Sequence, residues 1–111
     1  SYKVSASNRM IAWQTGEDVY SSESLVLMNL NTMERQEIKA GNREYIAPLG
    51  FMGEDLIYGV ARVEDRVRDN TGNMVFPMYR VRIQNENGED PGQPDKFIPF
   101  KERRERELYG D

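Results

Sequence analysis

Short apolar runs of strand length recur along this chain, separated by clusters of turn residues. In the first half they cover residues 2–7, 10–14 and 25–30, and a more polar run covers residues 34–39. Residues 25–30 read Leu-Val-Leu-Met-Asn-Leu, a run that is short for a helix and has turn residues at both ends. Such a run favours a buried strand. The pattern therefore predicts four strands in the first half of the chain.

A second set of four runs follows, at residues 45–51, 55–63, 78–83 and 96–100. The run that starts after Gly53 is apolar at both odd and even positions, so both of its faces are expected to exclude water. In the third run Tyr79, Val81 and Ile83 alternate with arginines, which is typical of a strand with one apolar face. Residues 64–73 are charged and are expected to form a loop.

The two halves can be aligned with each other by eye. Residues 10–13 match residues 56–59 at an offset of 46, and residues 27–30 match residues 80–83 at an offset of 53. The difference lies in the longer loop of the second half, where an insertion costs little free energy. A period of about 45–50 residues that carries four short strands is typical of a β-propeller blade.

In the second half, an aromatic residue and a turn precede Asp-Leu-Ile-Tyr-Gly, and an alternating strand ends shortly before Asn-Gly-Glu. This arrangement resembles a blade of TolB-like or WD-type β-propellers over most of residues 2–100, although the chain lacks the Trp-Asp and Gly-His pairs of such repeats. The resemblance implies an all-β, antiparallel fold with two four-stranded, blade-like repeats, at about residues 1–42 and 43–100. Complete propellers have more blades, so it implies a partial propeller; a small β-sandwich is the alternative.

The C-terminal residues differ in character from the rest of the chain. Opposite charges stand four positions apart, as in Lys101 and Glu105 or Glu102 and Arg106, which supports a short helix. A solvated, partly frayed end also fits this composition. We interpret residues 101–111 as a charged tail.

Composition narrows the class of partner. Fifteen basic and 19 acidic residues give a net charge of −4, and binding to nucleic acid is not expected because it requires a basic surface. No apolar run approaches the roughly 18 residues that cross a bilayer, and the first residues do not form a signal peptide. The chain starts without methionine, so we expect a segment whose targeting sequence, if any, lies upstream. Its acidic, cysteine-free composition and the resemblance favour a place outside the cytoplasm.

The residue types also restrict the chemistry. The chain has no histidine and no cysteine, which excludes disulfides and the Ser-His-Asp and Cys-His catalytic groups within it. Acidic pairs occur in predicted loops, but the residues before Gly72 and Gly88 lack the alternating oxygen ligands of a Ca²⁺-binding loop. We interpret these acids as solvated turn residues. No catalytic residue, cofactor or metal is expected in this chain.

Contact residues and core residues can be proposed from the pattern. The candidate contacts are aromatic residues in predicted loops or in the tail and two arginines on one face of a predicted strand: Tyr20, Phe76, Tyr109, Arg80 and Arg82. The two arginines also fit a solvated face that pairs with acids on a neighbouring strand. The residues expected in the core are Ile11, Trp13, Leu25, Leu27, Leu30, Leu56, Ile57, Tyr58 and Val81.

Two classes of function remain open. The first is a non-catalytic interaction module from a propeller-type repeat protein, with a protein or peptide partner. The second is an accessory domain of a larger extracytoplasmic hydrolase, a peptidase or a glycosidase. Two blades alone would leave apolar faces and open sheet edges uncovered. The isolated segment is therefore expected to associate with itself, most simply as a two-fold dimer, through surfaces that neighbouring blades would cover in the parent protein.

Overall fold

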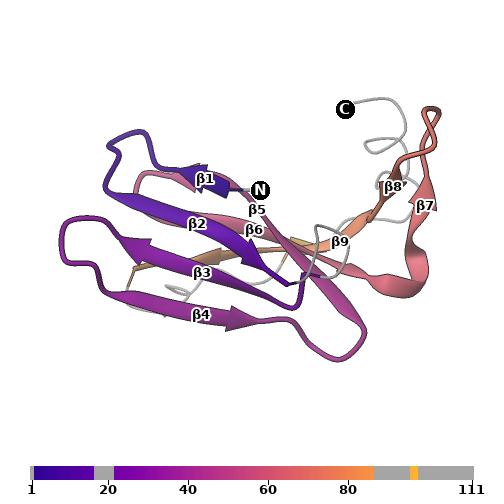
Figure 1. Cartoon of the computed structure of the whole chain (residues 1–111), viewed down its shortest axis with the longest axis horizontal. Helices are drawn as coiled ribbons and strands as arrows, with labels where there is room; N and C mark the ends of the chain where they lie inside the picture. Colours follow the sequence, from indigo (N-terminus) through magenta and orange to yellow (C-terminus); the bar gives the residue numbers. More distant parts are fainter. Residues whose placement is uncertain (1, 17–21, 87–95, 98–111) are drawn as a thin grey trace.

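The computed structural model describes residues 2–16, 22–86 and 96–97, and it contains two four-stranded sheets (Figure 1). The first sheet has the order β1 (Tyr2–Val4), β2 (Met10–Thr15), β3 (Ser24–Asn29) and β4 (Arg35–Lys39). The second has the order β5 (Glu44–Met52), β6 (Asp55–Arg62), β9 (Met78–Gln84) and β10 (Lys96–Phe97). All neighbouring strands are antiparallel, and none of the described sheets closes into a barrel. The all-β, antiparallel prediction is confirmed.

The predicted charged loop after β6 contains a small hairpin of its own. A 3-10 turn, η1 (Val63–Asp65), leads into β7 (Val67–Arg68), which pairs with β8 (Met74–Val75). This hairpin projects away from the two large sheets (Figure 1). Strands of two residues are too short to produce a periodic pattern, so the sequence predicted only a loop here. The predicted tail helix lies outside the described residues.

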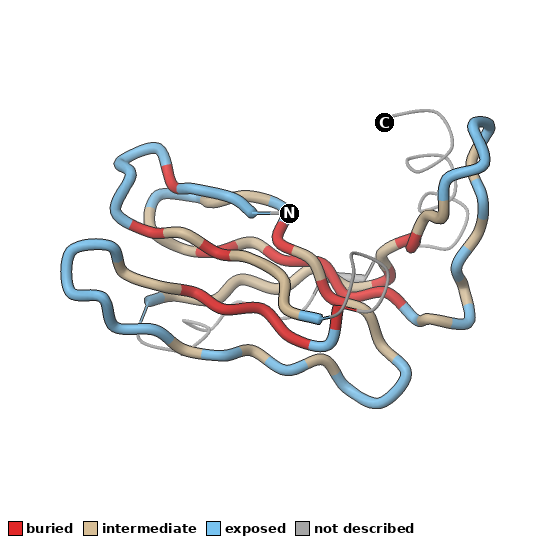
Figure 2. The backbone as a smooth tube through the Cα atoms, viewed as in Figure 1, coloured by how far each residue is buried: buried red, intermediate tan, exposed pale blue. Residues whose placement is uncertain are grey.

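One core lies between the two sheets (Figure 2). β5 runs against β1, β2 and β3, and brings the second sheet onto the first. The buried residues of this core come from both sheets: Met10, Ala12, Leu25, Leu27, Ile46, Leu56, Tyr58, Val60 and Tyr79. Removal of this apolar surface from water is the main stabilising contribution, and it is shared by the two sheets.

Part of the predicted core is wrong, because the strands turn the other of their two apolar faces toward the facing sheet. Met10 and Ala12 of β2 point into the core, whereas Ile11 and Trp13 point outward and are half-buried. Ile57 and Val81 are also only half-buried, on the outward side of the second sheet. Side chains alternate along a strand, so in a strand with two apolar faces only the stacking of the sheets decides which face is covered.

The prediction for Leu30 is wrong. Its side chain is 37% exposed, because β3 ends at Asn29 and Leu30 lies in the turn that follows. The predictions for Leu25, Leu27, Leu56 and Tyr58 are confirmed, since these four side chains are buried.

Polar side chains also join the two sheets. Gln14 Nε2 donates to the backbone oxygen of Ile46 at 3.1 Å, and Gln84 Nε2 donates to Gln36 Oε1 at 3.1 Å. Hydrogen bonds of this kind have strict geometry, so they set the relative position of the sheets more sharply than apolar packing alone.

The two sheets have the same orientation. In Figure 1 the strands follow one another from top to bottom as β1, β2, β3 and β4 in the front sheet, and as β5, β6 and β9 in the sheet behind it. The second strands, β2 and β6, both run toward the right (Figure 1). The sheets are therefore stacked head to tail: the back of the first sheet covers the front of the second.

Candidate functional site

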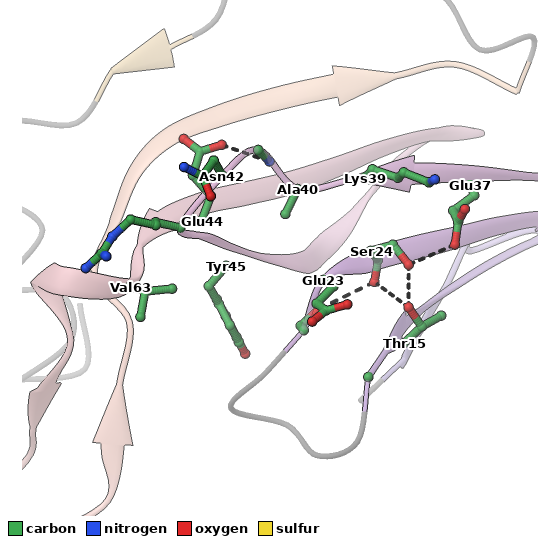
Figure 3. Close-up of a pocket in the computed structure, with 14 residues that line it drawn as sticks. Thr15, Glu23, Ser24, Glu37, Lys39, Ala40, Asn42, Glu44, Tyr45 and Val63 are labelled. Atoms are coloured by element: carbon green, nitrogen blue, oxygen red, sulfur yellow. Dashed lines mark hydrogen bonds between the residues drawn. The ribbon is translucent and has the colours of Figure 1, made fainter.

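A polar pocket of about 740 Å³ opens where β2 and β4 end and where β3 and β5 begin (Figure 3). Its position follows from the antiparallel order, which gathers these four strand ends at one end of the sheets. One wall carries hydroxyl groups from β2, β3 and the segment before β3, and the other carries residues of the β4–β5 connection and of β5.

The hydroxyl wall is a short hydrogen-bond chain (Figure 3). Ser24 Oγ donates to Glu37 Oε2 at 3.0 Å, and the hydroxyls of Thr15 and Ser24 are hydrogen-bonded to each other. Because the single hydroxyl proton of Ser24 goes to the carboxylate, Thr15 must be the donor to Ser24. Ser22 is also buried and donates to the backbone oxygen of Ser24 at 3.4 Å.

The opposite wall is organised around Glu44. Its Oε1 accepts the backbone N–H of Gly41 at 3.1 Å, and its Oε2 accepts the hydroxyl proton of Tyr79. The guanidinium carbon of Arg62 lies 4.4 Å from the centre of the Tyr79 ring, and that of Arg80 lies 5.2 Å away. Both distances fall within the range of cation–π attraction. This contact network holds the Glu44 carboxylate in a fixed position at the pocket.

The surroundings of Tyr79 disfavour its ionised form. Burial raises the pKa of Tyr79 above its ordinary value, and the hydrogen bond to Glu44 and the negative charge of that carboxylate raise the pKa further. The nearby arginines act in the opposite direction but do not reverse the shift. Tyr79 therefore stays a neutral hydrogen-bond donor at physiological pH.

The pocket can offer hydrogen bonds to a polar ligand. The Ser24 hydroxyl donates to the Glu37 carboxylate, and the chain contains no histidine that could serve as its base. Among the described residues, no group of three or more acidic side chains is placed to hold a metal ion.

The contact residues proposed from the sequence do not come together in one site among the described residues. Phe76 is only 7% exposed and stacks on Tyr45, with ring centres 4.0 Å apart and planes inclined by 6°. Arg80 and Arg82 are the cross-strand neighbours of Val60 and Tyr58, so they lie on the core side of the second sheet, where both are half-buried. Tyr20 and Tyr109 lie outside the described residues. No local pattern in the chain indicates the pocket, because its walls meet only when β5 folds back on the first sheet.

A second candidate site is the front of the first sheet, the side turned away from the second sheet (Figure 1). Two rows of cross-strand neighbours form this surface, which we call the first outer face. One row consists of Val4, Ile11 and Met28, and the other of Tyr2, Trp13 and Val26. Tyr2 is 65% exposed and Val4 is 39% exposed. Charged residues of β4 border this face, since Arg35 pairs with Met28 and Glu37 pairs with Val26.

The back of the second sheet is also apolar. Its cross-strand rows, with the bulged Leu49 beside them, form what we call the second outer face: Ala47, Leu49, Ile57, Gly59, Val81 and Ile83. Leu49 is 45% exposed, and its side chain lies over Gly59, where an added Cβ would be 3.3 Å from Leu49 Cδ1. Each sheet thus has one side in the core and one apolar side turned outward.

Comparison of the chain with protein-family models, with curated proteins and with solved structures found no match. In the described part of the chain, no helix has the length and apolar character needed to cross a membrane. The candidate sites therefore rest on the geometry of this chain alone.

Proposed function

We propose that this chain is a non-catalytic interaction module: a pair of blade-like sheets from a propeller-type repeat protein that binds protein partners through its outward sheet faces. The observation that carries this proposal is the apolar character of both outer faces, including the exposed side chains of Tyr2, Val4 and Leu49. Soluble monomers rarely leave large contiguous apolar patches uncovered, and such patches commonly mark interaction sites.

The head-to-tail orientation of the sheets supports the same proposal. Propellers repeat four-stranded sheets around an axis, and each blade covers one face of the next. Within this chain the back of the first sheet covers the front of the second. The front of the first sheet and the back of the second are the surfaces that neighbouring blades would cover.

Binding of the apolar dye ANS to the dilute, folded chain tests this proposal. We expect dye fluorescence to rise on addition of the native protein, and to fall when Val4→Arg and Leu49→Arg place a charge on each outer face. Asn70→Arg, in the exposed turn of the β7–β8 hairpin, is the matched control and should leave the signal unchanged. Absence of dye binding by the folded chain would show that both faces are covered and would reject the proposal.

A second candidate function rests on the polar pocket. Its hydroxyl and carboxylate groups suit a polar ligand, as an accessory domain of a larger extracytoplasmic hydrolase would need to hold part of a peptide or sugar. Saturable binding of short peptides or oligosaccharides that Glu37→Gln abolishes, with the fold intact, would favour this function over the first.

A further inference from the structure

We propose that the first outer face of this chain binds the second outer face of another copy, so that copies stack head to tail. This inference rests on the proposed function, because it identifies the partner of the outer faces as a second copy of the same chain. It follows from the one sheet-to-sheet interface that the chain already contains.

That internal interface is asymmetric. The side of the first sheet that carries Ala12 and Leu27 covers the side of the second sheet that carries Ile46 and Val60. Because both sheets have the same strand order and direction, the covered front of the second sheet corresponds to the first outer face. The first outer face is therefore suited to a surface that resembles the back of the first sheet.

The second outer face is such a surface. One cross-strand row on the back of the first sheet reads Lys3, Ala12, Leu27 and Gln36. One row of the second outer face reads Ala47, Gly59 and Val81. In both rows the second strand contributes a small residue and the third an aliphatic residue. The side chains of Met78 and Leu49 lie over Gly59, where an added Cβ would be 2.7 Å from Met78 Sδ and 3.3 Å from Leu49 Cδ1, so apolar side chains would meet the first outer face of a neighbouring copy at this point.

This correspondence uses an offset of 47 residues between β2 and β6, which aligns Ala12 with Gly59. The offset of 46 that the sequence alone favours aligns Met10 with Leu56, and both of these side chains point into the core. A shift of one residue moves every side chain of a strand to its other face. The stacking of the sheets, rather than residue similarity, therefore fixes the correspondence between the two faces.

The symmetry of the association follows from these faces. Contact between two different surfaces is heterologous, and it builds a closed ring or an open stack. The two-fold dimer expected from the sequence would instead place one outer face, or one sheet edge, against itself. Charged residues on β4, Arg35 and Glu37 among them, oppose pairing through that sheet edge.

Sedimentation velocity of the full chain, from low to high micromolar concentration, tests this inference. We expect the wild-type protein to grow beyond a dimer as its concentration rises. Val4→Arg blocks the first outer face and Leu49→Arg blocks the second, so each variant alone should stay at the monomer mass of 12.9 kDa. An equimolar mixture should form a complex of one copy of each variant and grow no further, because it retains one intact pair of faces.

Several outcomes would overturn the inference. A wild-type chain that stays monomeric at all concentrations would exclude the second copy as partner. If only one of the two variants abolishes association, the contact is two-fold and uses one face. If neither variant abolishes association, the contact lies elsewhere on the chain. Near-UV circular dichroism checks the fold of each variant. If one is unfolded, Tyr2→Arg and Met52→Arg replace the pair, since these side chains are 65% and 57% exposed on the same two sides.

The two proposals fail in different ways. Dye binding by a chain that stays monomeric would retain the outer faces as interaction surfaces for another protein, and would reject only the second copy as partner. Absence of both dye binding and association would reject the proposed function as well. The Asn70→Arg control should associate as the wild-type protein does.

Discussion

Leucines three positions apart have different surroundings in this protein. Leu27 lies in the middle of β3 and is 1% exposed, packed between the sheets, whereas Leu30 follows the end of the same strand and is 37% exposed. Their contributions to the free energy of unfolding should differ accordingly, because only buried side chains leave a cavity when they are shortened.

We expect Leu27→Ala to lower the free energy of unfolding by about 2–5 kcal/mol, through lost apolar burial and the cavity left behind. Leu30→Ala, the matched control, should change it by less than about 0.5 kcal/mol, as is usual for surface substitutions. Urea denaturation followed by circular dichroism measures both. Equal effects of the two substitutions would contradict the assignment of Leu27 to the core.

Tyr79 should make the stability of the protein depend on pH in the alkaline range. Its pKa is raised in the folded state above its ordinary value of 10, mainly by burial and by the hydrogen bond to Glu44. The folded state therefore holds this proton more tightly than the unfolded chain. The stabilising contribution is complete below the unfolded pKa and is lost as the pH rises through the raised folded pKa.

Tyr79→Phe should remove this dependence, because phenylalanine has no proton to lose. At neutral pH the substitution should also destabilise the fold by about 1 kcal/mol, since the hydrogen bond to Glu44 is lost. Denaturation midpoints of the two proteins across the alkaline range measure both effects. Tyr2→Phe, on an exposed side chain, is the control and should leave the profile unchanged; a wild-type stability that rises with pH above 10 would contradict the assigned direction.

At the scale of elements, the β7–β8 hairpin owes its turn to local hydrogen bonds. Asp69 Oδ1 accepts the backbone N–H groups of Thr71 and Asn73 at 2.8 and 3.0 Å, and the Thr71 hydroxyl at 2.7 Å. Gly72 has a φ of 88°, a conformation that glycine adopts without strain. The hydrogen bond from Thr71 lowers the pKa of Asp69 below its ordinary value of 3.8.

Asp69→Ala should loosen this turn and speed amide hydrogen exchange at Thr71 and Asn73. In the wild-type protein the stabilising contribution of the carboxylate is present above the ordinary pKa of Asp69 and is lost as the pH falls through its lowered folded pKa. NMR spectra recorded over the acidic range measure this loss. Asn70→Ala, at the exposed position beside Asp69, should leave the exchange rates unchanged, and exchange unaffected by Asp69→Ala would contradict the role of the turn.

At the scale of the whole molecule, the two sheets share one core and should unfold together. The chain has a single tryptophan, Trp13, which lies in the first sheet. Leu56 belongs to the second sheet and is fully buried in the shared core. A substitution at Leu56 should therefore shift the unfolding transition that a probe in the other sheet reports, as cooperative unfolding of a small domain requires.

We expect Leu56→Ala to shift the unfolding transition reported by Trp13 fluorescence, and to shift the transition reported by far-UV circular dichroism by the same amount. Asn70→Ala, in the β7–β8 turn, is the control and should shift neither transition. A fluorescence transition that stays in place while the circular dichroism transition moves would show that the two sheets unfold independently.

Much of the fold could be predicted from local pattern. All eight strands of the two four-stranded sheets overlap runs that the sequence pattern predicts as strands. The turn residues around Gly53 also predict the β5–β6 hairpin. Strand alternation and turn residues are local properties, so they are visible in the sequence. The residue types alone also exclude catalysis by histidine or cysteine within this chain.

The tertiary structure alone decided which faces are buried and where a site can form. Along β2, Met10 and Ala12 lie on one side and Ile11 and Trp13 on the other, so both sides are apolar and the pattern could not show which one is buried. The choice depends on how the second sheet stacks on the first, an interaction between residues far apart in the chain. The pocket beside Ser24 and the two outer faces arise from that same stacking, because they exist only relative to a second layer.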